Sequence, residues 1–269
     1  MDYDPVKDRL VRFFETSVFG HRLFFAILHL VFLRSWYVRR ALARILDATP
    51  DARVLDAGTG FGQYTDWMIR RYPKCHITAV DIKRDYLSRL SGYLAAAGLQ
   101  DRVDVRYGDL VHLEETGPFD LVLSVDVMEH ILEDVQVFTH FRRVLAPSGR
   151  LIVNTPSDQG GSNVQSDGEA SFIGEHVRDG YGVAEIAEKL SRAGLADEVI
   201  EFGYGKAGSL GWRLLVHVPM QLLGRSMLFL PIVAVYYLVG MPLGLLLNGA
   251  DMATTNPIGT GLTVVAKKA

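Results

Sequence analysis

Short apolar runs alternate with amphipathic segments along most of the chain. Runs of four to seven residues with an apolar core are typical of buried strands, whereas longer segments with one apolar face are typical of helices that cover a sheet. We expect strands at 54–57, 76–81, 103–107, 119–125, 150–154, 198–202 and 261–266. Helices are expected at 63–71, 134–145 and 183–193. This alternation predicts an α/β fold.

The first expected strand leads into the most informative part of the chain, Val54-Leu55-Asp56-Ala57-Gly58-Thr59-Gly60-Phe61-Gly62. Three glycines between a strand and a helix predict a tight turn where bare backbone can approach a ligand. The dinucleotide-binding pattern requires a glycine where this chain has Gln63. The phosphate-binding loop requires a lysine after its last glycine, and none follows. The turn therefore fits neither of those two patterns.

Acidic residues close the next two strands. Asp81 lies 19 residues after Gly62, where a carboxylate can accept both hydroxyls of a ribose. Asp109 follows the third strand, and a Pro147-Ser148-Gly149 turn precedes the fifth. The two acids follow neighbouring strands, as expected for a nucleoside site in an open α/β sheet.

The chain resembles the class I S-adenosylmethionine (SAM)-dependent methyltransferases, in their small-molecule and lipid branch (methyltransferase type 11-like). The resemblance lies in the order of its motifs: the acid-x-Gly-x-Gly-x-Gly turn, the two later acids and the Pro-x-Gly turn. The resemblance covers about residues 52–201 and the last strand. It implies a Rossmann-like, seven-stranded sheet with helices on both faces and an antiparallel last strand. It also implies that SAM is the methyl donor and S-adenosylhomocysteine the product.

The resemblance implies a cofactor-binding role for ten residues: Asp56, Gly58, Thr59, Gly60, Gly62, Asp81, Ile82, Asp109, Leu110 and Val125. In the family, the acid at Asp81 takes the ribose hydroxyls and the acid at Asp109 accepts a hydrogen bond from the adenine amino group. Structural roles stay open for the acids: Asp56 can orient the loop, Asp81 can cap the next helix and Asp109 can cap a loop.

The acceptor side has one candidate general base, His176, in the segment before helix 183–193. Histidine transfers protons near neutral pH, and a base is needed only if the acceptor loses a proton. A structural role that bonds this loop to the sheet is the alternative for His176. Four further residues are expected on the substrate side or in structural roles beside it: Glu129, His130, Arg178 and Tyr181.

Composition excludes several function classes. The net charge is −3 and there is no basic block in the core, which argues against a nucleic-acid partner. Cys75 is the only cysteine, so a disulfide framework and a cysteine-rich metal site are both excluded. The spacing of the remaining candidate ligands suggests no metal.

An apolar segment precedes the last strand. Residues 226–250 carry no charge over 25 residues, a length that can cross a bilayer core. A single crossing would separate the last two strands, which the family pairs in one sheet. We therefore expect a hydrophobic insertion that leaves and returns on one side, with Pro231 and Pro242 interrupting its helices. Upstream, Arg213, His217, Gln221 and Arg225 form one polar stripe, typical of an in-plane membrane helix that Pro219 should kink.

The N-terminal region also favours a membrane surface. Residues 1–44 carry eight Lys or Arg and four Asp or Glu, and the apolar run 23–33 is too short to span a bilayer. Aromatic residues and arginines around this run, Arg22, Arg34, Trp36, Tyr37, Arg39, Arg40 and Arg44, predict an anchor for an anionic leaflet. The alternative is a helix pair that covers the SAM site.

These observations predict N-terminal membrane-associating helices at 1–48, a SAM-dependent methyltransferase core at 49–207, a hydrophobic insertion at 208–252 and a final strand at 253–269. The expected protein is peripheral or monotopic, on the cytoplasmic face of a prokaryotic inner membrane. A homodimer formed through the insertion is a further expectation.

The favoured acceptor is lipophilic, namely a prenylated quinone-type or aryl-lipid ring methylated at carbon or oxygen. Phospholipid head-group N-methylation is the alternative enzyme activity. A non-catalytic SAM-binding membrane adaptor is the alternative from another class.

Overall fold

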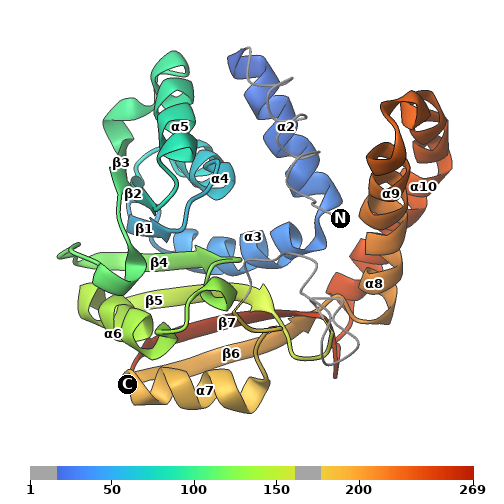
Figure 1. Ribbon diagram of the computed structural model, residues 1–269. Helices are drawn as coiled ribbons and strands as arrows, with labels where there is room; N and C mark the ends of the chain where they lie inside the picture. The colour runs from blue at the N-terminus through green and yellow to red at the C-terminus, as the bar shows by residue number, and fades with distance from the viewer. Residues whose placement is uncertain (1–16, 161–176) are drawn as a thin grey trace.

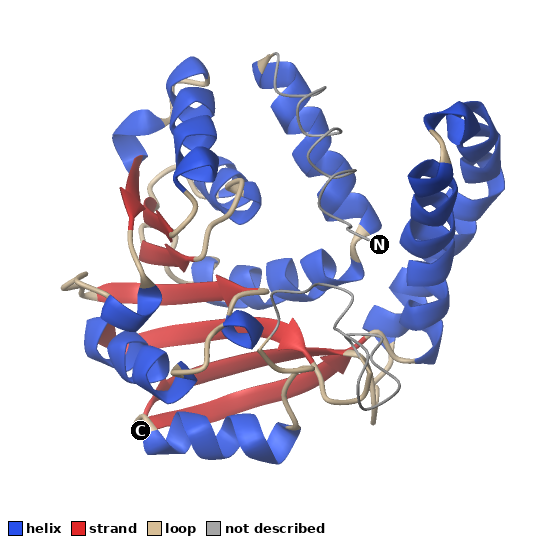
Figure 2. Cartoon of the chain, in the orientation of Figure 1, coloured by secondary structure: helices blue, strands red, loops and turns tan. Residues whose placement is uncertain are grey.

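The computed structural model describes residues 17–160 and 177–269, which form a three-layer α/β/α arrangement (Figures 1 and 2). The seven strands lie in the order β3-β2-β1-β4-β5-β7-β6, and only β7 runs antiparallel to its neighbours. The predicted fold class is confirmed. The strands are β1 (Arg53–Ala57), β2 (His76–Asp81), β3 (Val103–Tyr107), β4 (Phe119–Val125), β5 (Leu145–Pro156), β6 (Leu195–Gly203) and β7 (Gly261–Lys268).

Each face of the sheet has its own hydrophobic core, because side chains alternate between faces along a strand. Val54 of β1 packs with α2 (Val18–Val31), α3 (Leu33–Leu46), α4 (Gln63–Arg71) and α5 (Arg84–Ala96). The next residue, Leu55, packs on the other face with α6 (Asp134–Val144) and α7 (Val183–Arg192). Short 3-10 turns connect the elements at η1 (Gln100–Arg102), η2 (Leu110–His112) and η3 (Met128–His130).

The start of β5 differs from the sequence prediction. Strand β5 begins at Leu145, and the expected turn at Pro147–Gly149 lies within it. Leu145 pairs with Phe119 and Arg150 pairs with Leu121, so β5 advances five residues while β4 advances two. The Pro-x-Gly segment is therefore a bulge in a continuous strand and does not precede it.

Between β6 and β7 the chain forms a helical hairpin. It ascends through α8 (Lys206–Trp212), a π-helical turn, η4 (Arg213–His217), and α9 (Val218–Arg225), then turns at η5 (Met227–Phe229) and returns through α10 (Leu230–Ala253). Figure 1 shows α9 and α10 projecting from the sheet on the same side as α2. The hairpin leaves and re-enters one sheet, as the strand topology requires.

The prolines act differently from the prediction. Pro231 lies in the first turn of α10, where its missing N–H costs nothing. Pro242 lies inside α10, which continues through it from Leu230 to Ala253, so the expected interruption there is wrong. Pro219 lies in the first turn of α9, one residue after Val218 and close to the π-helical turn, whose wider backbone accommodates the proline ring.

Glycines allow the two arms of the hairpin to approach closely. A Cβ added at Gly244 of α10 would lie 2.4 Å from the Leu215 side chain, and one added at Gly211 of α8 would lie 2.6 Å from Asn248. Small residues at such crossings let helix backbones approach closely and gain dispersion contacts.

A buried carboxylate fixes the base of the hairpin. Asp251, near the end of α10, is fully buried and accepts hydrogen bonds from the Tyr37 hydroxyl (2.8 Å), the Gly208 backbone N–H (3.0 Å) and the Asn256 side-chain amide (3.2 Å). Gly208 is in the first turn of α8, where unpaired N–H groups favour an anion. Asp251 therefore joins α10, α8 and α3 at one point.

The N-terminal helices are bent against each other by 96° and cover α4. His29 of α2 lies 2.5 Å from the Ser35 hydroxyl and 3.3 Å from the backbone carbonyl of Gln63, the first residue of α4. Burial lowers the pKa of His29 to about 4, so the ring is neutral at pH 7. Two of the arginines predicted to face a membrane turn inward instead: Arg34 pairs with Asp126, and Arg40 pairs with Glu201.

Replacing Asp251 by alanine removes the carboxylate that accepts from Tyr37, Gly208 and Asn256. Hydrogen bonds to charged groups contribute about 1.5–3 kcal/mol each, and an unsatisfied buried donor adds a desolvation cost. We expect the free energy of unfolding, measured by urea denaturation, to fall by about 3 kcal/mol. Asp101→Ala removes an exposed carboxylate and serves as the control, with an expected change within about 0.5 kcal/mol. Equal stability of the two variants would contradict the role of Asp251.

Candidate functional site

The glycine turn between β1 and α4 is held from beneath by Asp56. Its carboxylate is buried and accepts hydrogen bonds from the hydroxyls of Thr59 (2.9 Å) and Thr65 (2.6 Å). Burial raises the pKa of Asp56 to about 6, and the two hydroxyls oppose that rise. The structure thus gives Asp56 the loop-orienting contacts considered from the sequence, made through side chains.

The three glycines of the turn all have positive φ, at +84°, +56° and +83° for Gly58, Gly60 and Gly62. A Cβ at Gly58 would lie 2.2 Å from Val127, and one at Gly62 would lie 2.3 Å from Leu90. A Cβ at Gly60 would meet no atom within 4 Å. Gly58 and Gly62 are therefore required by packing, whereas Gly60 exposes backbone to open space where a ligand can approach.

Asp81, at the carboxyl end of β2, connects the turn to the next helix. One carboxylate oxygen accepts from the Gly60 N–H at 2.8 Å, and the other accepts from the Lys83 N–H at 2.7 Å. Lys83 is the N-cap residue of α5, so Asp81 also supports the start of that helix. Each oxygen keeps a further lone pair for a ribose hydroxyl. The adjacent Ile82 is exposed, as a side chain that contacts an adenine would be without ligand.

Asp109 caps the 3-10 turn that follows β3. Its carboxylate accepts from the Val111 N–H at 2.9 Å and lies 3.1 Å from His112 Nδ1, and the Val111 N–H lowers its pKa. The capping role considered from the sequence is present, and the carboxylate is still partly exposed. Leu110 is buried beneath it, and Val125 is half-buried at the end of β4.

The structure adds three residues to the site: Arg34, which the sequence predicted to face a membrane, and Asp126 and Tyr64, to which it assigned no role. Arg34, at the start of α3, pairs with Asp126, which follows β4 and has a positive φ of +52°. Arg34 Nε and the hydroxyl of Tyr64, in the first turn of α4, are buried without a hydrogen-bond partner among the described residues. Burial raises the pKa of the Tyr64 phenol, and the nearby Arg34 charge opposes the rise.

Unsatisfied buried donors beside a glycine turn are expected where a ligand supplies the missing acceptor. The amino-acid part of SAM carries a carboxylate, which can accept from Arg34 and Tyr64. Together with the open backbone at Gly60 and the carboxylates of Asp81 and Asp109, these donors fit SAM.

The predicted substrate-side residues fall into two groups. Glu129 is buried, accepts from the Thr155 hydroxyl at 3.1 Å, and has a pKa raised to about 7 by burial. His130 lies beside it and is half-buried.

Arg178 and Tyr181 instead donate to one carboxylate, that of Asp134 at the start of α6, at 2.5 and 2.8 Å. Lys189 donates to the same oxygen at 2.7 Å. These contacts account for Arg178 and Tyr181 structurally, and their substrate-side role stays a prediction. His176 lies outside the described residues, so its role as base also stays a prediction. Within residues 17–160 and 177–269, no group of three or more His, Cys, Asp or Glu side chains could hold a metal ion.

Comparisons with known proteins agree with this site. Residues 54–149 match the family model of a methyltransferase domain. The chain is 30% identical to the ubiquinone biosynthesis O-methyltransferase of Xylella fastidiosa strain 9a5c, over 54% of this chain and 61% of that protein. It is 27% identical to the phosphoethanolamine N-methyltransferase of Triticum aestivum, over 58% of this chain and 30% of that protein.

The chain thus spans less than two thirds of the length of these curated relatives. A crystal structure from Galdieria sulphuraria, assigned provisionally as a sarcosine dimethylglycine methyltransferase, has the same fold. It aligns with a TM-score of 0.61 at 21% identity, over 87% of this chain and 85% of that one. The matched domain, the fold and the glycine-turn geometry lead to one conclusion: the chain contains a methyltransferase domain, matched over residues 54–149, with the class I SAM-dependent methyltransferase fold.

Proposed function

We propose that this protein is a membrane-associated methyltransferase that acts on a lipophilic acceptor. The observation that carries the proposal is the exposed apolar surface of the helical hairpin, which is attached to a methyltransferase domain. When bound, SAM supplies an activated methyl group on a sulfonium. The acceptor nucleophile bonds to the methyl carbon while the carbon–sulfur bond breaks toward sulfur, giving S-adenosylhomocysteine.

The chain's own contribution to this reaction is mainly positioning and exclusion of water. Asp81 and the open backbone at Gly60 hold one end of the donor, and Arg34 and Tyr64 hold its carboxylate. An acceptor that loses a proton needs a base, and His176 remains the predicted one. Glu129, which is buried and whose pKa is raised to about 7, lies after the carboxyl end of β4 and accepts a hydrogen bond from Thr155 near the end of β5.

Membrane association rests on α10. The segment Met227–Ala253 is long and apolar enough to cross a membrane, yet less than a fifth of its most apolar stretch is buried in the protein. Its outward face carries large apolar side chains that are about three-quarters exposed: Leu238, Val239 and Leu246. Soluble monomers rarely expose contiguous apolar surface on this scale. Because the hairpin returns to the same sheet, we propose that it enters one leaflet without spanning the bilayer.

A second apolar surface, on α2, supports the proposal that this side of the protein faces a membrane. Helix α2 exposes Phe19, Leu23, Ile27 and Leu30 along one side. Figure 1 shows the start of α2 and the α9–α10 connection projecting in the same direction. Val31 at the end of α2 packs with Leu215 of the hairpin, close in sequence to Arg34 of the donor site. An acceptor that reaches SAM by passing between α2 and the hairpin would come from the lipid phase. This route favours a lipophilic acceptor.

Among lipophilic acceptors we favour a prenylated quinone-type or aryl-lipid ring, methylated at oxygen or carbon. Similarity to a ubiquinone biosynthesis O-methyltransferase supports this choice. Similarity to a phosphoethanolamine N-methyltransferase supports the alternative, a phospholipid head group. The site lies on the cytoplasmic side in this proposal, because SAM is made there.

Removing the Asp81 carboxylate tests the donor site. Asp81→Ala loses a charged acceptor for the ribose and the support of Gly60, so we expect SAM affinity to fall about 10- to 100-fold, equivalent to about 1.5–3 kcal/mol. Isothermal titration calorimetry measures this change. Asp101→Ala is the charge-matched control and should bind like the parent protein. An unchanged dissociation constant for Asp81→Ala would remove Asp81 from the site.

The activity itself is tested with methyl-labelled SAM and a total-lipid extract, followed by identification of the labelled lipid. If His176 is the base, His176→Ala should lose about two orders of magnitude in turnover while its SAM affinity stays unchanged. Full turnover in this variant would rule out the base role. Absence of label in every lipid, despite SAM binding, would favour the non-catalytic adaptor.

Membrane association is tested by flotation with lipid vesicles. We expect the parent protein to stay with vesicles in high salt and to be released by detergent, because apolar contacts are not screened by salt. Two charges on the outward face of α10, Leu238→Glu with Leu246→Glu, should reduce vesicle binding at least tenfold. Leu132→Glu alters a similarly exposed leucine outside the hairpin and is the control. A parent protein that is monomeric and vesicle-free without detergent would contradict the proposal.

A further inference from the structure

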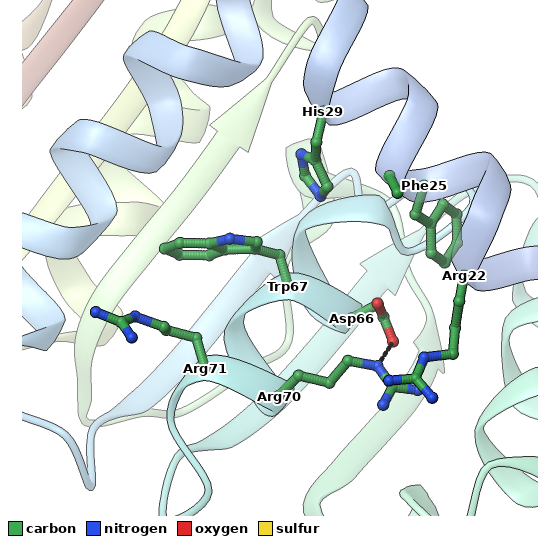
Figure 3. A pocket seen from close by; sticks show the side chains of 8 residues that line it. Arg22, Phe25, His29, Asp66, Trp67, Arg70 and Arg71 are labelled. Carbon is green, nitrogen blue, oxygen red and sulfur yellow. Dashed lines mark hydrogen bonds and ion pairs between the residues drawn. The ribbon is translucent and has the colours of Figure 1, made fainter.

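A second candidate binding site lies between α2 and α4, apart from the open backbone at Gly60. It is an open groove of about 360 Å³, shown in Figure 3. Arg22 reaches it from α2, and Asp66, Trp67, Arg70 and Arg71 reach it from α4. The methyl-transfer chemistry described above uses none of these five side chains.

The groove carries an excess of positive charge. Asp66 and Arg70 neutralise each other through a 2.7 Å ion pair, and both also bond to the Tyr93 hydroxyl, at 2.6 and 2.9 Å. Arg22 and Arg71 are exposed and form no ion pair within the part of the chain that the structure describes. Arg22 of α2 and Arg70 of α4 both line the groove, and Figure 3 shows the ion pair of Arg70 with Asp66. Positive charge that reaches one groove from two helices is stabilised by a bound anion.

The walls of the groove suit an amphipathic ligand. Trp67 is half-buried, with the guanidinium of Arg39 centred 5.9 Å from its ring, which adds positive charge near the groove. His29 lines the inner wall and is neutral at pH 7, because burial lowers its pKa. Tryptophan is enriched at the head-group level of membranes.

An apolar surface begins immediately beside this charge. Arg22 and Ala26 line the groove, and the next row along α2 is the exposed stripe Phe19, Leu23, Ile27 and Leu30. A ligand with its anionic part in the groove therefore has apolar surface within reach of its remaining atoms. A free phosphate ion would leave that surface in water, whereas a phospholipid covers it with acyl chains.

We propose that the α2–α4 groove binds the phosphate of an anionic phospholipid, whose acyl chains lie along the exposed stripe of α2. The inference rests on the proposed membrane association and adds a head-group site to it. The site selects lipid by charge, whereas the outward face of α10 binds any apolar phase. Bound lipid would also fix α2 over the start of α4, where His29 lies 3.3 Å from the Gln63 carbonyl.

Vesicle binding with matched charge variants tests this site. Arg22→Gln with Arg71→Gln removes the two arginines of the groove that have no ion pair. Arg213→Gln with Arg225→Gln removes two exposed arginines from the hairpin and gives the same change in net charge. Binding is measured on phosphatidylcholine vesicles and on vesicles that also contain phosphatidylglycerol. We expect the parent protein to prefer the anionic vesicles, the groove variant to lose that preference about tenfold, and the control variant to retain most of it.

The outcomes separate the two proposals. Equal losses in the two variants would mean diffuse attraction to the surface and would overturn the groove site. Equal binding of the parent to both vesicle types would also overturn the groove site while leaving membrane association intact. Binding to neither vesicle type would overturn both proposals.

Tryptophan fluorescence then locates the lipid. In a protein that keeps only Trp67, made by Trp36→Phe and Trp212→Phe, brominated phosphatidylglycerol should quench emission, and the two groove substitutions should abolish the quenching. A protein that keeps only Trp212 reports hairpin contact with the bilayer and should be quenched regardless of the groove substitutions. If soluble glycerol phosphate shifts Trp67 emission as strongly as the vesicles do, the ligand is a free phosphate and the lipid assignment is wrong.

Discussion

The carboxylate of Asp251 is the interaction on which the arrangement of the two helical additions depends. A buried charge is costly unless hydrogen bonds replace its water. Here a tyrosine hydroxyl, an amide and a helix N-terminus supply them. The hydroxyl is that of Tyr37 in α3, and the helix N-terminus is that of α8. The Asp251 carboxylate therefore connects the N-terminal helices to the hairpin, and through Asn256 it connects both to the segment that leads into β7. Burial and hydrogen bonding to Asp251 also raise the pKa of Tyr37, which keeps the phenol protonated as a donor.

The donor side of the molecule was largely predictable from sequence. Strands β2, β3 and β4 and helix α4 have the predicted bounds, because each is a short apolar or amphipathic run bounded by polar or glycine residues. The acids that end β2 and follow β3 converge on one edge, since parallel strands place their carboxyl ends together. Local patterns of this kind carry enough information to place backbone and to nominate Asp81 and Asp109.

Long-range pairings could not be read in the same way. Arg34 and Asp126 are 92 residues apart, and the positive φ of Asp126 has no glycine to signal it. Arginines spaced along an apolar N-terminus look alike in sequence, yet Arg34 and Arg40 turn inward while Arg22 faces the α2–α4 groove. Pro242 suggested a break in α10, but the helix continues through it and packs closely against α8 and η4 at Gly244. Tertiary contacts decided these cases, and single-residue preferences did not.

The position of the hairpin has a consequence for biosynthesis. Strand β7 pairs with both β5 and β6, so it is an interior strand, yet it is the last strand of the sequence to leave the ribosome. The apolar α10 emerges immediately before it. The sheet therefore cannot close until the hairpin has been made, and during that interval a nascent chain exposes both the unpaired edge of β5 and an uncovered apolar helix. A nearby lipid surface would shelter the helix while β7 is completed, which links the order of synthesis to the place where the protein folds.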